Sequence, residues 1–397
     1  MYEAFDNDIL SSPGHGGHRR LGIVGGGQLA SMTAAAARRL GCDVRVLERY
    51  AFSPASHAAG DTMIGDWDDE AVLTRFAAGV DVVTIENEFV SADALAAIEA
   101  RGTAVWPSTS TLRLVQDKLI QKETLASASL AVTPFAGVES VDELRNVARQ
   151  FGWPVVLKTR RNGYDGKGNA TIRTPDEIES AWQQLGGGTT PLYVEAFCPF
   201  EREVATIVTR GINGDVAVYP LVETIQHNHV CRIAKAPADV PDAVAGRAAR
   251  LAVAAIEAVG GVGSFGVEMF LTADGLLSIN ELAPRVHNSG HYTIEGCLCS
   301  QFENHVRAIM GWPLGATSMT APAVVMMNLL GVVQAPGIPH GLTTALAVPG
   351  AHIHLYGKAM SGRGRKMGHI TATGATMAEA LQTATTASAA ITFGPQQ

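Results

Sequence analysis

The sequence lacks the features that mark membrane-spanning, secreted and zinc-binding proteins. It has no run of eighteen uninterrupted apolar residues, and residues 1–18 contain no apolar core of signal-peptide length. Its five cysteines are odd in number and show no paired spacing of the kind that binds zinc. We therefore expect a reduced, cytoplasmic protein that does not enter a membrane.

Positive charge is scarce as well. The 30 Lys and Arg residues are outnumbered by 38 Asp and Glu residues, which gives a formal net charge of −8. A protein that binds nucleic acid by neutralising phosphates needs the opposite balance, so we expect no nucleic-acid partner. Small anionic substrates stay open, because they require only local positive charge.

Apolar sequence is abundant, at 47% hydrophobic residues over a length of 397, which is enough for several domains. Strand and helix signals alternate from residue 21 and predict an open parallel sheet up to about residue 108. A second α/β region follows, and short strands after about residue 323 predict a small closing subdomain. The expected strands of the first sheet are 21–24, 43–47, 80–85 and 104–106, with helices over 29–40 and 69–78.

Two acidic strands on either side of residue 275 carry the most informative pattern. If Asp274 and Gly275 form a two-residue hairpin turn, counting outward places Glu268 directly opposite Glu281. Facing carboxylates repel, so a folded protein that keeps them is expected to neutralise them with a cation. Oxygen ligands favour Mg²⁺, which commonly completes its shell with water and nucleotide phosphates. Two solvated acids on an exposed strand are the alternative.

A second pattern places a lysine before a glycine-rich loop. Lys158 ends an apolar strand just before residues 163–168. This arrangement suits a triphosphate, because the ammonium attracts phosphate and the N–H groups of the loop can close over it. Taken alone, the loop could equally be a plain hairpin connection. The order of lysine, glycine loop and acidic hairpin favours nucleotide binding.

The glycine turn at residues 25–27 follows a strand and opens a helix, and Glu48 ends the next strand about twenty residues later. This spacing matches the dinucleotide fingerprint, in which helix N–H groups bind phosphate. Three interpretations stay open: a phosphorylated substrate, a nicotinamide cofactor and a tight structural turn.

Other charged residues suggest substrate contacts. Glu86 and Glu88 follow a buried parallel strand, where open α/β sheets bind ligands, and we expect them to share one face. Lys358, Arg365 and Lys366 bring three cations together in the tail, which suits a phosphate monoester. The alternatives are a solvated sheet edge and a solvated basic turn.

Together these motifs resemble the ATP-grasp superfamily and, within it, the N5-carboxyaminoimidazole ribonucleotide synthetase family. The most similar stretches are residues 25–29, 163–168, 280–291 and 364–369. The resemblance implies a mixed α/β and α+β architecture, with an ATP-grasp fold between a Rossmann-like (preATP-grasp) domain and a small C-terminal subdomain. The implied divisions are a disordered lead-in at 1–19, the Rossmann-like domain at 20–115, the ATP-grasp domain at 116–320, with a lid at about 135–210 and a base at about 211–320, and the C-terminal subdomain at 321–397.

The resemblance also implies a reaction. ATP would phosphorylate bicarbonate to carboxyphosphate, and the exocyclic amine of 5-aminoimidazole ribonucleotide would then be carboxylated, with Mg²⁺ as cofactor. The family further implies a role in purine synthesis, a homodimer, and a separate mutase that receives the product. Tyr164 and Asp165 would lie where the proton is transferred, and Arg285 would also act in catalysis.

The binding residues implied by the resemblance form three sets. Glu268 and Glu281 would hold Mg²⁺. The nucleotide would contact Lys118, Lys158, Gly163, Tyr164, Asp165, Gly166, Lys167, Gly168, Asn169, Glu195, Ala196, Phe197, Cys198, Glu203, Gln226, Asn280 and Glu281. The ribonucleotide would contact Gly26, Gln28, Leu29, Glu86, Glu88, His287, Asn288, Lys358 and Arg365.

Asn280 and Gln226 in the nucleotide set do not follow the simplest expectation. Strict strand alternation would point Asn280 away from Glu281, so a twist or bulge must be present if both serve one site. Gln226 stands where the family commonly has a histidine, and His227 and His229 are candidate substitutes.

Three rival functions remain at this stage. The first is another ATP-grasp ligase, such as formate-dependent glycinamide ribonucleotide transformylase, which would leave residues 364–369 unexplained. The second is an NAD-dependent oxidoreductase that uses residues 25–30 and Glu48. The third is a non-catalytic nucleotide-binding paralogue.

Overall fold

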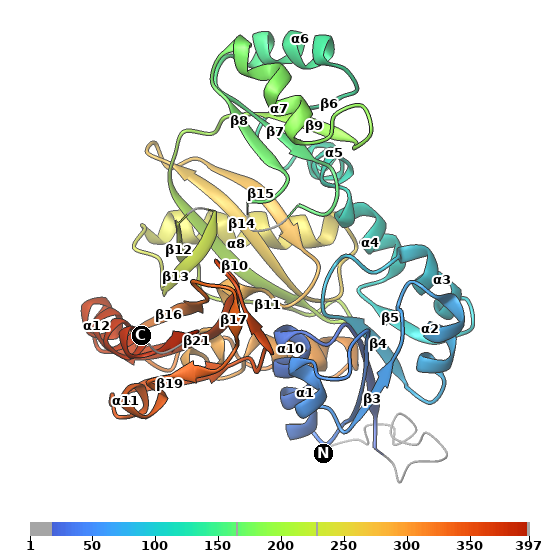
Figure 1. Cartoon of the computed structure of the whole chain (residues 1–397), viewed down its shortest axis with the longest axis vertical. Helices are drawn as coiled ribbons and strands as arrows, with labels where there is room; N and C mark the ends of the chain where they lie inside the picture. Colours follow the sequence, from blue (N-terminus) through green and yellow to red (C-terminus); the bar gives the residue numbers. More distant parts are fainter. Residues whose placement is uncertain (1–17, 164–165, 228, 395–397) are drawn as a thin grey trace, which may run out of the picture.

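The computed structural model describes residues 18–163, 166–227 and 229–394 (Figure 1). The expected lead-in lies outside the described residues except for residues 18 and 19, and so do Tyr164 and Asp165. Within the described ranges, no helix combines the length and the apolar character needed to cross a membrane.

The N-terminal region is a five-stranded parallel sheet in the order β3-β2-β1-β4-β5. Helices α2 and α3 cover one face of this sheet, and α1 covers the other face together with α10 from later in the chain. Burial on both faces explains the apolar runs of β1 and β4. The sequence pattern predicted every strand except β3, which is short and only partly buried. The elements are β1 Arg20–Val24, α1 Gln28–Arg39, β2 Asp43–Glu48, η2 Pro54–His57, β3 Asp61–Ile64, α2 Glu70–Ala77, β4 Val82–Ile85, α3 Ala92–Glu99 and β5 Ala104–Trp106.

Helices α4 and α5 lead to a four-stranded antiparallel sheet in the order β6-β9-β7-β8, which we call the lid sheet. It stands at the top of the molecule in Figure 1. Helices α6 and α7 share an apolar core with its strands. The elements are α4 Thr109–Gln116, α5 Lys118–Ser127, β6 Phe135–Val138, α6 Val141–Phe151, β7 Val155–Thr159, β8 Asn169–Ile172, η3 Pro175–Glu177, α7 Ile178–Gln184 and β9 Leu192–Ala196.

The largest sheet, the base sheet, has nine strands in the order β15-β14-β10-β12-β13-β16-β21-β19, with β11 beside β10. Helix α8 packs on β10, β14 and β15 at one end of the sheet, and α12 packs on β16 and β21. Pairing of β13 with β16 makes the sheet continuous into the C-terminal part of the chain.

The middle elements are β10 Phe200–Arg210, β11 Val216–Val218, β12 Val222–His227, β13 Val230–Ala236, α8 Asp242–Ala258, β14 Gly263–Thr272, β15 Leu277–Ala283, η4 Asn288–Gly290, α9 Thr293–Gly296 and α10 Gln301–Ile309. The C-terminal elements are β16 Ala323–Leu330, β17 Ala335–Pro336, β18 Pro339–His340, α11 Leu342–Leu346, β19 Ala351–Leu355, β20 Met360–Ser361, β21 Lys366–Gly374, α12 Met377–Ala390 and β22 Thr392–Phe393.

The N-terminal sheet and the base sheet meet in what we call the neutral joint, formed by Thr84, Ser264 and His305. The Nδ1 atom of His305 accepts the N–H of Ser264 at 3.0 Å, so its Nε2 carries the proton and donates to Thr84 Oγ1 at 2.9 Å. Burial lowers the pKa of His305 to about 4, which keeps the ring uncharged at pH 7. Val306 and Ile309 pack into the same apolar core as α1.

Candidate active site

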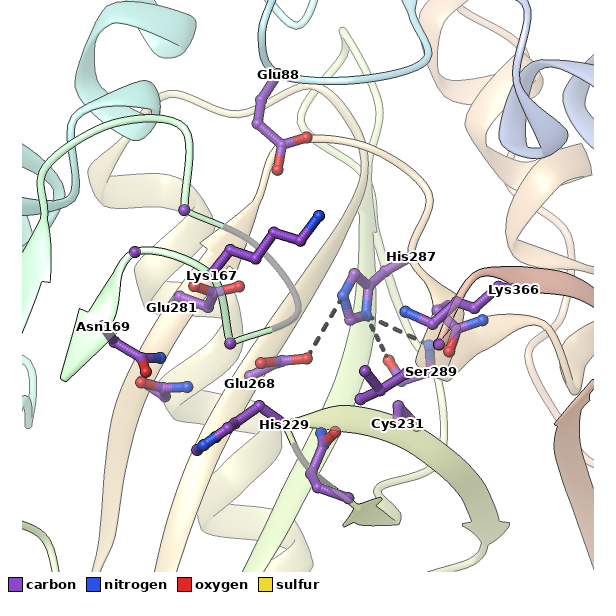
Figure 2. Close-up of a pocket in the computed structure, with 18 of the residues that line it drawn as sticks. Glu88, Lys167, Asn169, His229, Cys231, Glu268, Glu281, His287, Ser289 and Lys366 are labelled. Carbon is purple, nitrogen blue, oxygen red and sulfur yellow. Dashed lines mark hydrogen bonds and ion pairs between the residues drawn. The ribbon is translucent and has the colours of Figure 1, made fainter. Parts of the chain in front are cut away.

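A cavity of about 800 Å³ opens where the lid sheet, the base sheet and the N-terminal region meet (Figure 2). Most of the residues singled out from the sequence line it, although they come from distant parts of the chain. They are Gln28, Leu29, Glu88, Lys118, Lys158, Gly163, Gly166, Lys167, Gly168, Asn169, Glu203, Gln226, Glu268, Asn280, Glu281, Arg285, His287, Asn288, Lys358 and Arg365.

Some expected site residues do not line this cavity. Gly26 and Glu86 lie at the first glycine turn, behind the cavity wall, and Glu195 is enclosed by lysines, as described below. The end of β9 and the residues after it, Ala196, Phe197 and Cys198, are also absent from the lining. Tyr164 and Asp165 lie outside the described residues.

The carboxylate pair expected from the hairpin is present, but the turn differs from the prediction. Glu268 on β14 pairs with Glu281 on β15. The turn has three residues instead of two, because the N–H of Thr272 donates to the carbonyl of Leu276 at 3.0 Å. Gly275 takes the left-handed conformation that such a turn requires, with φ of +79°.

A β-bulge at Asn280 restores the register that the longer turn displaces. Met269 faces Ile279 while Glu268 faces Glu281, so Asn280 has no partner on β14. The bulge brings Asn280 and Glu281 to one side of the strand, and both line the cavity. This is the condition under which both residues can serve one site.

The two paired carboxylates have different electrostatic surroundings. Burial and the charge of Glu281 raise the pKa of Glu268. Burial also acts to raise the pKa of Glu281, but its ion pair with Lys118 outweighs this and lowers it. His287 Nε2 lies 3.5 Å from Glu268 Oε1, and burial lowers the pKa of His287 to about 4, so this ring adds no positive charge at pH 7. Glu268 is therefore a half-buried acid that a cation would stabilise as the carboxylate.

This donor set fits Mg²⁺. Glu268 and Glu281 supply hard oxygen ligands from adjacent strands, and Mg²⁺ usually takes the rest of its shell from water and phosphates. Within the described part of the chain, no three His, Cys, Asp or Glu side chains form a group that could hold a metal ion alone. Residues of this site would thus bind the ion together with a phosphorylated ligand.

Lysines and a glycine loop line the side of the cavity formed by the lid sheet. Lys158 on β7 and Lys167 in the loop both contribute to its wall. Gly166 and Gly168 have φ of +78° and +83°, which glycine adopts without strain. A Cβ on Gly168 would lie 2.4 Å from Thr159 Oγ1, so the loop also needs glycine for space. The loop can thus bring backbone N–H groups close to an anion.

Glu195 was expected to hold adenine or ribose, but its side chain is enclosed by two lysines. Oε2 lies 3.0 Å from Lys158 Nζ, and Oε1 lies 3.4 Å from Lys122 Nζ in an ion pair. Burial acts to raise the pKa of Glu195, but the two lysines outweigh it and lower the pKa to about 2. Glu195 is only 2% exposed, so its carboxylate is not open to a ligand. We call Lys122, Lys158 and Glu195 the ionic joint.

The first glycine turn uses its amide groups internally. The Oε2 atom of Glu48 accepts the N–H of Gly26 at 2.8 Å. A Cβ on Gly27 would lie 2.0 Å from Glu86 Oε1, because this carboxylate occupies the amino end of α1. A phosphate would bind at that position in a dinucleotide site. The structure therefore supports a tight turn closed by two acids, and it removes the basis for a nicotinamide site.

Glu88 lines the cavity, whereas the carboxylate of Glu86 lies at the amino end of α1, within reach of the charges of Arg285 and Lys358. The chain bends directly after β4, which ends at Ile85. Arg285 donates to both oxygens of Glu88, at 2.5 Å from Nε and 3.0 Å from Nη2. Burial acts to raise the pKa of Glu88, but Arg285 outweighs it and lowers the pKa. This two-point contact joins the N-terminal region to the chain after β15.

A basic end of the cavity is formed by the C-terminal part of the chain. Lys358, Arg363, Arg365 and Lys366 all line it. Asn288 at the start of η4 lies on the same wall and donates to Asn328 Oδ1 on β16 at 3.0 Å. Four cations within one wall provide the charge that a phosphate monoester would need.

Sequence reasoning missed several residues of this region. The main one is Lys122, which follows Lys118 by one helical turn on the buried side of α5, a spacing that could have identified it. Of the candidate substitutes beside Gln226, His229 lines the cavity and His227 does not. Other unpredicted lining residues are Phe89, Thr159, Tyr193, Thr224, Val230, Cys231, Ser289 and Gly364.

Three family models match consecutive parts of the chain. They are the ribonucleotide synthetase preATP-grasp domain over residues 18–116, the ATP-grasp domain over residues 123–302, and the phosphoribosylaminoimidazole carboxylase C-terminal domain over residues 324–383. The expected fold, an ATP-grasp domain between these two flanking domains, is confirmed.

Individual relatives agree with these matches. The N5-carboxyaminoimidazole ribonucleotide synthase of Synechococcus elongatus is 40% identical over 371 residues, which cover 93% of this chain and 93% of the relative. The phosphoribosylaminoimidazole carboxylase of Schizosaccharomyces pombe is 41% identical over 358 residues, which cover 88% of this chain but only 64% of that longer protein. The crystal structure of N5-carboxyaminoimidazole synthase from Aspergillus clavatus, in complex with ADP and 5-aminoimidazole ribonucleotide, has a TM-score of 0.85 and 37% identity, and covers 92% of this chain and 96% of that one.

Proposed function

The chain belongs to the N5-carboxyaminoimidazole ribonucleotide synthase family of ATP-grasp enzymes, and we propose that it carboxylates 5-aminoimidazole ribonucleotide with ATP and bicarbonate. The products would be N5-carboxyaminoimidazole ribonucleotide, ADP and phosphate, made in purine biosynthesis. One observation carries this proposal: a single cavity joins a carboxylate pair, with lysines and a glycine loop beside it, to a separate basic end. ATP and a second phosphorylated ligand could therefore bind side by side.

The nucleotide would occupy the part of the cavity between the lid and base sheets. Lys118, Lys158 and the loop at residues 163–169 would bind its phosphates, and Glu203 would accept hydrogen bonds from its ribose. Asn280 and Gln226 would complete this part of the site. Glu268 and Glu281 would hold Mg²⁺, which when bound supplies positive charge against the phosphates and the transferred phosphoryl group.

The ribonucleotide would occupy the remaining part of the cavity. Lys358 and Arg365 would bind its phosphate, because they lie at the basic end. Glu88, His287 and Asn288 would contact its sugar and base, together with Gln28 and Leu29 at the start of α1. Gly26 and Glu86 would act indirectly by fixing the turn that positions Gln28.

The chemistry requires two bonds to form in sequence. A bicarbonate oxygen attacks the γ-phosphorus of ATP and ADP leaves; the exocyclic amine then attacks the carboxyl carbon and phosphate leaves. The amine is a weak nucleophile, so a group must take its proton, and we assign this role to Tyr164 or Asp165. Arg285, held by Glu88, would stabilise the charge that develops on the carboxyl and phosphate oxygens.

Other properties of the family are proposed with this activity. The enzyme would work as a homodimer in the cytoplasm and pass its product to a separate mutase. Neither nucleic acid nor a membrane would be a partner.

The proposal is tested by ADP release in the presence of ATP and Mg²⁺, with the ribonucleotide and bicarbonate each omitted in turn. Release should require both, and an acid-labile carboxylated ribonucleotide should accumulate with the ADP. ADP release that ignores the ribonucleotide would refute the substrate assignment. Release that depends on formate and glycinamide ribonucleotide would establish the transformylase alternative.

A further inference from the structure

Lys122 on α5 is a buried charged residue that lies just behind the cavity wall. It is 1% exposed and does not line the cavity, so it contacts no ligand there. Its ammonium lies 3.4 Å from Glu195 Oε1 and donates to Thr133 Oγ1 at 3.2 Å. It also donates to the carbonyl of Ile279 at 3.1 Å. A fully buried ammonium is costly, so these contacts offset a large desolvation penalty.

Lys122 shares the carboxylate of Glu195 with Lys158. Lys158 does line the cavity, and its ammonium lies 3.0 Å from Glu195 Oε2. The three groups together carry one net positive charge, because two lysines face one carboxylate. Without Lys122, Glu195 and Lys158 would form a neutral pair, and Lys158 would attract an anion in the cavity less strongly.

The contact with Ile279 connects this charge balance to the carboxylate pair. Ile279 is the last regularly paired residue of β15 before the bulge at Asn280 and Glu281. Its N–H donates to the carbonyl of Ala131 at 2.8 Å, so both backbone groups of Ile279 are held from the α5 side. Lys122 thus contacts the phosphate-binding lysine, through Glu195, and the strand that carries the metal-binding carboxylate.

We propose that Lys122 is a positioning residue for nucleotide binding, which leaves Lys158 with unshared positive charge and fixes the strand before the bulge. This proposal rests on the proposed ATP-dependent activity. Lys122 would act through Glu195 and Ile279 without touching ATP itself. Its effect should therefore fall on ATP and not on the ribonucleotide at the other end of the cavity.

The test is Lys122→Met, which keeps most of the side-chain volume and removes the charge. Binding of ATP with Mg²⁺, measured by calorimetry without ribonucleotide, should weaken about tenfold, the range expected when one charge-assisted contact is lost. In the steady state, KM for ATP should rise while KM for the ribonucleotide stays unchanged. The control is Lys235→Met, which removes a lysine paired with Glu223 on the base sheet, outside the cavity.

A second pair of variants separates positioning from general support of the fold. In the Glu195→Gln background the carboxylate no longer neutralises Lys158, so adding Lys122→Met should weaken ATP binding clearly less than in the unmodified protein, because only the contact with Ile279 is then lost. Equal losses in both backgrounds would overturn the proposal, and so would unchanged ATP affinity in the single variant. Lys122→Met still leaves Glu195 paired with Lys158, and the double variant has no carboxylate at this position, so neither protein contains an unpaired buried carboxylate.

The outcome is distinguishable from failure of the proposed function. ATP binding is measured without the ribonucleotide, so a protein that binds ATP but uses a different substrate would still show the effect of Lys122. Loss of ribonucleotide-dependent turnover in the unmodified protein would count only against the substrate assignment.

Discussion

The base sheet is attached to its two neighbours by contacts of opposite chemistry. Toward the N-terminal sheet, the neutral joint uses an uncharged imidazole, a hydroxyl and a backbone N–H, surrounded by apolar side chains. Toward the lid sheet, the ionic joint uses two lysines and a carboxylate, of which Lys122 and Glu195 are almost fully enclosed and Lys158 is partly exposed. Only the ionic joint contributes a side chain, Lys158, to the cavity lining and contacts the strand that carries Glu281.

This difference distinguishes the contacts that stabilise the fold from the contacts that support the candidate active site. Neutral, well-paired contacts carry little desolvation cost and support stability. Buried ion pairs add little net stability over apolar packing but are costly to break. Changes at the neutral joint should thus alter unfolding, and changes beside the ionic joint should alter nucleotide chemistry.

The largest expected effect comes from Glu281, on the ionic side. Glu281→Gln should lower turnover by about 100-fold or more, because a bound Mg²⁺ would lose a charged ligand. The thermal midpoint should change little, since relief of the repulsion with Glu268 offsets loss of the ion pair with Lys118. Steady-state kinetics and calorimetry check both statements, with Glu303→Gln on α10 as a control acid outside the cavity. An active Glu281→Gln variant would disprove the metal assignment.

Acid pH should lower the free energy of unfolding through the neutral joint. Unfolded His305 binds a proton near pH 6.5, whereas the folded protein binds it only near pH 4, because burial lowers the pKa. The unfolded state therefore holds more protons between these values, so stability falls as pH drops from about 6.5 to 4, by roughly 3 kcal/mol for this group.

Urea unfolding at several pH values measures this slope. His305→Gln should reduce it by about one proton, or roughly 1.4 kcal/mol per pH unit. The remaining slope would combine His287, His291 and His369, whose pKa values burial also lowers, with Glu268, whose raised pKa acts in the opposite direction. An unchanged slope would mean that His305 is not held neutral by the fold.

Thr84→Val probes the same joint at pH 7. The variant keeps the shape of the side chain but leaves the buried Nε2–H of His305 without its acceptor, which should cost about 1–3 kcal/mol of unfolding free energy. The KM values for ATP and ribonucleotide should stay the same. Thr386→Val, at an exposed hydroxyl of α12, is the matched control. A change in KM for ATP would show that the two joints are not independent.

The smallest effect is expected for an exposed ion pair in the lid. Asp142 on α6 pairs with Arg145 at 2.6 Å, but its side chain is 86% exposed. Asp142→Asn should change stability by about 0.5 kcal/mol or less, because water and salt screen such pairs. Denaturant unfolding with and without about 0.5 M added salt, which strongly screens exposed charges, tests this. A larger loss would show that charge matters in the lid irrespective of burial.

The sequence predicted much of this fold because its local signals agree with its global arrangement. The apolar runs of β1 and β4 match burial on both faces, and the opposition of Glu268 and Glu281 is confirmed. The edge strand β3 was missed because half-buried strands lack a strong apolar pattern. The predicted turn of the hairpin was one residue too short, and the bulge at Asn280 restores the register of Glu268 and Glu281.

Side-chain partners were harder to predict than elements. Glu195 has a spacing suited to a ligand, but only the structure shows that it is enclosed by Lys122 and Lys158. Glu86 and Glu88 alternate in sequence, yet the chain leaves the strand before Glu86, so alternation no longer applies. Contacts between distant segments decide these cases, and periodicity carries no information about them.

Because of the bulge at Asn280, the exposed turn at residues 273–275 influences the wall of the distant cavity. The same stretch of chain could pair in a second way, with a two-residue turn and no bulge, and Glu268 would still face Glu281. Asn280 would then point to the opposite face, and so would Leu277, Ser278 and Ile279, which would take Ile279 out of the core. A two-residue I′ turn would need positive φ at both Asp274 and Gly275, and only Gly275 has it. Substitutions in this solvent-exposed turn would therefore move the amide of Asn280 in the cavity without replacing any residue that lines the cavity.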